Sequence, residues 1–72
     1  MIELISMSNT WNNDPSRRIV ELQSDTAPAQ LPMNGNGIPG MSESILIAPG
    51  STFIVLNPFK VNRMGTSGWY EI

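Results

Sequence analysis

The segment from Ser24 to Gly40 sets the strongest limit on what this chain can fold into. It contains three prolines and three glycines. Proline fixes φ and lacks the N–H donor that a helix interior or a central strand requires. The Asn34-Gly35 and Asn36-Gly37 pairs are typical of tight turns. The segment therefore predicts extended chain with turns, and neither a continuous helix nor a central strand.

Two interpretations of this proline- and glycine-rich segment remain open. The first is an ordinary long connection, or a linker that is partly disordered. The second is an ordered arm laid across a neighbouring subunit. The second interpretation would explain why apolar residues such as Leu31 and Ile38 occur where no regular element is expected. Loops of this length are uncommon inside compact domains and are often functional.

The residues before this segment predict two short strands. Met1–Met7 alternates in part and suits a strand or an extended arm. Residues 17–23 have a β-branched centre and predict a strand, with Val20 and Leu22 facing away from Ile19, Glu21 and Gln23. Asp14-Pro15 offers an alternative, a short helix with proline at its first position.

The second half of the chain has the clearer strand pattern. A short apolar run at 44–47 precedes a strong strand at 51–56, and further strands are expected at 60–64 and 69–72. The turns between the last three are short, which predicts an antiparallel meander. We therefore expect a single, mainly β domain over 1–72. Strands and an extended proline- and glycine-rich arm would occupy 1–43, and the small antiparallel meander 44–72.

The composition argues against catalysis. The chain has 72 residues and lacks both cysteine and histidine, which removes thiolate chemistry, the commonest general base and the preferred transition-metal ligands. The six acidic residues are scattered singly, so they predict neither a carboxylate pair nor a calcium loop. We expect no enzymatic activity, no catalytic or metal-binding residue and no cofactor.

Charge and size point to protein partners. Four basic residues and a net charge of −2 do not make a phosphate-binding surface, and no apolar run is long enough to span a membrane. We expect no nucleic-acid or membrane partner. A domain this small often relies on disulfides, metals or association for stability. Only association is open to this sequence, which predicts a homo-oligomer or docking onto a larger lattice.

The adjacent aromatic residues Trp69 and Tyr70 carry the most specific indication of a partner. Successive residues of a strand face opposite sides of the sheet. One of these rings can pack in the local core, and the other must be exposed or covered by another protein. Aromatic side chains are enriched in protein interfaces, so Tyr70 is a candidate contact.

The C-terminal third resembles the ends of short accessory structural proteins of tailed bacteriophages. The resemblance rests on Gly50–Leu56, a hairpin ending at Met64, and Gly68–Ile72. Those proteins often have a Tyr-Met-Leu-like strand before the last turn, where this chain has Val61–Met64. The hairpin is therefore expected to pack differently. No functional residue is transferred by this resemblance.

The resemblance implies a non-enzymatic virion accessory protein, made in the host cytoplasm. It would decorate or cement a capsid, or join head or tail parts, through contacts with other virion proteins or with copies of itself. The alternative is a small acidic inhibitor or adaptor that binds a host protein. The expected partner contacts are six side chains: Ile2, Leu4, Trp11, Leu31, Ile38 and Tyr70.

Overall fold

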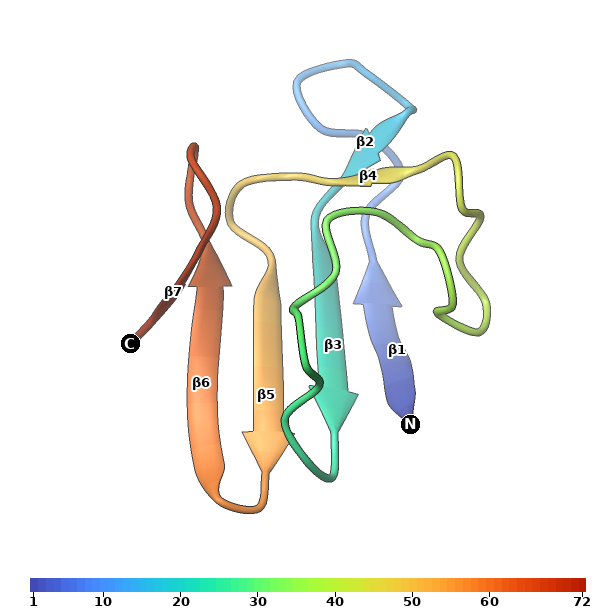
Figure 1. The fold of residues 1–72 in the computed structure, drawn as a ribbon. Helices are drawn as coiled ribbons and strands as arrows, with labels where there is room; N and C mark the ends of the chain where they lie inside the picture. The colour runs from blue at the N-terminus through green and yellow to red at the C-terminus, as the bar shows by residue number, and fades with distance from the viewer.

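The computed structural model describes all 72 residues as a small β protein (Figure 1). The mainly β prediction is confirmed, and the alternative of a short helix from Asp14 is wrong because the structure has no helical residue. No helix long and apolar enough to cross a membrane is present. The seven strands are β1 (Ile2–Met7), β2 (Arg17–Arg18), β3 (Val20–Ser24), β4 (Leu46–Ile47), β5 (Thr52–Leu56), β6 (Phe59–Met64) and β7 (Trp69–Glu71).

Five of the strands form one mixed sheet in the order β1-β3-β5-β6-β7. Neighbouring strands are antiparallel except for β3 and β5, which are parallel. The short strands β2 and β4 pair with each other in parallel as a separate two-stranded ribbon. β5, β6 and β7 pair antiparallel in chain order, but they belong to a larger mixed sheet that also includes β1 and β3, so a separate meander over 44–72 is not confirmed.

The chain from 25 to 51 is the crossover that makes β3 and β5 parallel. It leaves the end of β3, crosses one face of the sheet and returns to the start of β5 (Figure 1, green to yellow). This route fits the interpretation of the segment as a long connection, and the arm laid across a neighbouring subunit is not confirmed. The crossover lies on the chain's own sheet, where Ile38 and Met41 join the core. A parallel connection must always cross a sheet in this way.

The core lies between the covered face of the sheet and the crossover. Phe53 and Leu22 are fully buried at its centre, on the adjacent strands β5 and β3. Alternation along β3 buries Val20, Leu22 and Ser24 and leaves Glu21 and Gln23 on the other side, so the predicted facing of Val20 and Leu22 is confirmed. The full core cluster is Val20, Leu22, Ile38, Met41, Ile47, Phe53, Val55 and Met64.

Two polar contacts fasten the crossover to the sheet. The buried Ser51 hydroxyl accepts a hydrogen bond from the Val20 N–H at 3.0 Å and donates one to the Ala48 carbonyl at 2.7 Å. The indole N–H of Trp69 donates to the Pro32 carbonyl at 2.8 Å. The Trp69 ring also meets Phe53 edge to face at 6.1 Å between centroids. Trp69 is therefore the inward-facing member of the Trp69-Tyr70 pair.

Candidate functional site

The face of the sheet opposite the crossover has no second layer, and we call it the open sheet face. No chain segment crosses it in Figure 1. This face carries the residues of β3 and β5 that point away from the core. It also carries the residues of β1, β6 and β7 that pair with them or continue their alternation. Its members are Glu3, Ser6, Glu21, Gln23, Thr52, Ile54, Leu56, Phe59, Val61, Arg63, Tyr70 and Ile72.

An apolar patch occupies the half of the open sheet face formed by β5, β6 and β7. Phe59 is 70% exposed, Ile72 66%, Tyr70 53% and Leu56 42%. Ile54 and Val61 are half-buried between them. Ile72 belongs to the same surface because its N–H bonds the Val61 carbonyl at 2.9 Å and continues the β6–β7 ladder. These six residues, the apolar patch, are adjacent by register and are not scattered over the surface.

The charges on the open sheet face are divided between its two halves. Glu3 and Glu21 lie on β1 and β3, whereas Arg63 lies on β6 beside the apolar patch. Glu21 and Arg63 both pair with Thr52, so they share one cross-strand row. The only ion pair in the structure joins Lys60 and Glu71. Glu21 and Arg63 therefore have no charged partner within the chain.

The six predicted contact residues do not gather at one site. Only Tyr70 lies in the apolar patch. Its exposure fits the expectation that Trp69 and Tyr70 face opposite sides of the sheet. Ile2, Leu4 and Leu31 are half-buried against the core. Their role as partner contacts, like that of Tyr70 and Trp11, stays a prediction. The expectation that Ile38 contacts a partner is corrected, because Ile38 is 3% exposed in the core and its side chain is not free to reach another protein.

The sequence interpretation missed most of the apolar patch, notably Leu56 and Phe59. The sequence predicted strands at 51–56 and 60–64, which left Phe59 in the turn between them and out of any strand. In the structure Leu56 pairs with Phe59 across a loop of only two residues. The available signal was the run of five apolar or β-branched residues at 52–56, because alternation must place some of them on the second face of the sheet.

Trp11 lies at a separate hairpin turn beyond the end of the main sheet. Trp11 and Asp14 exchange two backbone hydrogen bonds, at 3.2 and 2.9 Å. The central residues Asn12 and Asn13 have φ of 53° and 63°, as a type I′ turn requires. The Arg17 guanidinium lies 5.9 Å from the centroid of the Trp11 ring. Cation–π contact and turn geometry thus account for the position of Trp11 without a partner.

The environment of Asp14 shifts the pKa of its carboxyl group. Its Oδ1 accepts hydrogen bonds from the Ser16 hydroxyl at 2.6 Å and the Ser16 N–H at 2.9 Å. These bonds, the hydroxyl bond above all, lower the pKa of Asp14 below its ordinary value of 3.8. Because the folded pKa is the lower one, the stabilisation is complete above pH 3.8. It is lost as the pH falls through the folded pKa.

Ser16→Ala is expected to raise the pKa of Asp14 toward its ordinary value, because the variant loses the hydroxyl donor and keeps the backbone donor. An NMR titration of the Asp14 carboxyl carbon measures the shift. Ser67→Ala, in a distant turn, serves as the control and should leave the titration unchanged. An unaltered Asp14 pKa in Ser16→Ala would contradict the assigned hydrogen bond.

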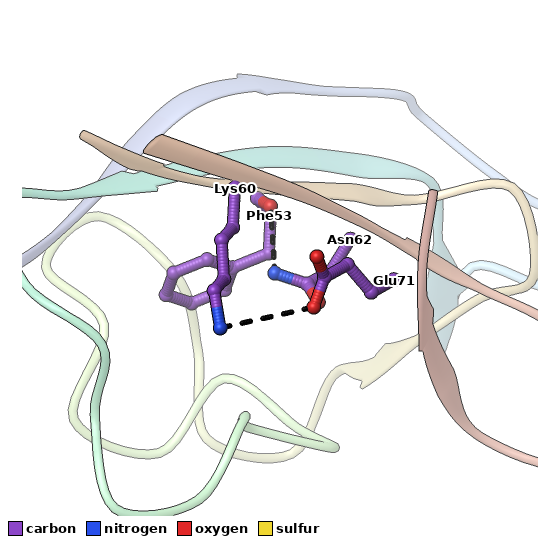
Figure 2. A network of polar contacts seen from close by, with 4 residues as sticks. All are labelled: Phe53, Lys60, Asn62 and Glu71. Carbon is purple, nitrogen blue, oxygen red and sulfur yellow. Dashed lines mark hydrogen bonds and ion pairs between the residues drawn. The ribbon is translucent and has the colours of Figure 1, made fainter. Parts of the chain in front are cut away.

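A small polar group lies at the margin of the covered face. Figure 2 shows Lys60, Asn62 and Glu71 on the same side of the sheet as the Phe53 ring. The Lys60 Nζ is 3.9 Å from the Glu71 Oε1, and the Asn62 amide donates to the Phe53 carbonyl at 3.4 Å. Because Lys60 and Glu71 are both exposed, their pair contributes little to stability. The group marks where solvent meets the core.

The chain has no enclosed pocket, and no three acidic, histidine or cysteine side chains cluster as metal ligands do. No protein-family model, curated protein or solved structure matches the chain. The open sheet face is therefore the candidate site, on the strength of its own geometry.

Proposed function

We propose that this chain is a non-enzymatic structural protein that binds other protein subunits through the open sheet face. The observation that carries the proposal is the apolar patch, with four large side chains between 42% and 70% exposed on a face without a second layer. Sheets of soluble domains normally bury an apolar face against another layer. A partner protein would supply that layer here.

The energetics of the apolar patch favour such a partner. Burial of one large apolar side chain contributes about 1.5–3 kcal/mol relative to leaving it in water. Phe59 and Tyr70 are aromatic, and rings of this kind commonly provide the strongest contacts of an interface. Arg63, beside Tyr70 in the register, adds a residue type that is also enriched in interfaces.

The resemblance of the C-terminal third to accessory proteins of tailed bacteriophages supports a place in a phage particle. The chain would decorate or cement a capsid, or join parts of the head or tail, and its partners would be other virion proteins or copies of itself. Neither role requires a bound cofactor.

The proposal is tested by asking whether the apolar patch is needed for association with particles. Phe59→Glu places a charge at the most exposed ring of the patch and should lower the amount of the chain recovered with purified particles by about tenfold or more. Quantitative mass spectrometry of the particles measures it. Met33→Glu is the matched control, because Met33 is similarly exposed but lies on the crossover.

Equal recovery of the two variants with particles would contradict the use of this face. Absence of the unaltered chain from particles would contradict the phage role. In that case, a stoichiometric complex with a soluble host protein, disrupted by Phe59→Glu, would indicate the small acidic inhibitor or adaptor.

A further inference from the structure

We infer that the open sheet face pairs with the same face of a second copy of this chain, about a two-fold axis parallel to the strands and between β5 and β6. This rests on the proposed function, because it names the partner for the same face. Two sheets packed in this way lie about 10 Å apart with their strands nearly aligned. The result would be a β-sandwich made from two chains.

The apolar patch fits this arrangement because its residues on β5 lie over its residues on β6 of the second copy. The axis sets β5 of one copy over β6 of the other. Leu56 then faces Phe59 of the second copy, since the two residues share one cross-strand row. Ile54 faces Val61 of the second copy for the same reason. Each apolar side chain of β5 thus meets an apolar side chain, in both directions.

The charges determine the direction of the axis. With the axis parallel to the strands, β3 of one copy lies over β7 of the other, so Glu21 comes over Tyr70 and beside Arg63 of the second copy. Two symmetric pairs form between groups that have no charged partner within one chain. An axis across the strands would instead place the acidic strands β1 and β3 over themselves, where like charges repel.

The size of the face sets the expected strength. In this arrangement β1 has no strand opposite it. The four overlapping strands, spaced about 4.8 Å apart and about five residues long, span about 19 by 17 Å. Stable interfaces bury about 800 Å² on each partner, which is less than a fifth of the 4519 Å² accessible surface of this chain. The projected face lies below that size, so we expect a dimer that dissociates on dilution.

Reversal of the two charges tests the pairing. In Arg63→Glu the new carboxylate lies beside Glu21 of the second copy, and in Glu21→Lys the new ammonium lies beside Arg63 of the second copy, so each variant alone brings like charges together. Each should weaken the dimer by about tenfold or more. An equimolar mixture should restore dimers. The introduced lysine of one chain then meets the introduced glutamate of the other, and the remaining Glu21 meets the remaining Arg63. Sedimentation equilibrium over a wide concentration range measures all four samples.

Restored dimers in the mixture, with both single variants monomeric, would support the two-fold arrangement and also show that both variants fold. A monomeric unaltered chain at every concentration would overturn self-pairing. Dimers that persist in both single variants would overturn this face or this axis as the contact.

Failure of self-pairing and failure of the proposed function give different results. If the unaltered chain is monomeric but Phe59→Glu still abolishes association with particles, the open sheet face binds a different protein and the proposed function stands. If the charge exchange behaves as expected but particles lack the chain, self-pairing stands without the phage role.

Discussion

Phe53→Ala is expected to remove a large fraction of the protein's stability. Phe53 has no exposed surface and lies on the middle strand of the five, where it contacts Trp69 edge to face. Truncation of a buried phenylalanine costs about 3–5 kcal/mol. A domain of this size has a total stability of about 4–11 kcal/mol at the usual stability per residue. The midpoint of urea denaturation, followed by tryptophan fluorescence, should fall sharply.

Phe59→Ala is the matched control, because the same side chain is removed from the other face of the same hairpin. Phe59 is 70% exposed, so the stability of the dilute, monomeric chain should change by less than about 0.5 kcal/mol. Its effect should appear in association instead. Equal losses of stability in the two variants would contradict the assignment of a covered face and an open face.

The strands and their facing could be predicted from local residues. The buried and exposed residues of β3 alternate as the pattern at 17–23 indicates. The run at 51–56 becomes β5, near the centre of the sheet. These features depend on side chains within a few positions of one another, and period-two alternation records them directly.

The parallel pairing of β3 with β5 could not be predicted in the same way. It depends on the route of the crossover, which separates the two strands by 27 residues (25–51). Proline and glycine exclude regular structure there but do not say which surface the segment covers. The burial of Ile38 follows from that route. Its apolar character is equally compatible with a core position and a partner contact, and the surrounding turns do not distinguish them.

The candidate site was predicted at one residue and missed at its neighbours. Because Trp69 and Tyr70 are adjacent in a strand, their rings face opposite sides of the sheet, and Tyr70 is the exposed ring. The exposure of Leu56 depends instead on a whole sheet face lacking a second layer. That fact becomes visible only when the crossover is known to occupy the opposite face.

Gly35→Ala is expected to detach part of the crossover from the sheet. A Cβ atom at Gly35 would collide with the Ser42 carbonyl oxygen and come within 2.7 Å of the Met41 Cγ. The Gly35 N–H also donates to the Ile45 carbonyl at 2.9 Å, so the residue cannot shift without breaking this bond. Forced overpacking typically costs about 1–3 kcal/mol, and we expect the upper end because the obstacle is backbone.

Gly37→Ala separates this steric effect from backbone strain. A Cβ atom at Gly37 meets nothing within 4 Å, but its φ of +78° is unfavourable for alanine, at a cost of about 1–2 kcal/mol. Urea denaturation should therefore rank Gly35→Ala as the less stable variant. Amide exchange should locate its loss of protection around Ile38 and Met41, with β5 and β6 less affected. The reverse ranking would contradict the close approach of the Gly35 backbone to the Ser42 carbonyl within the crossover.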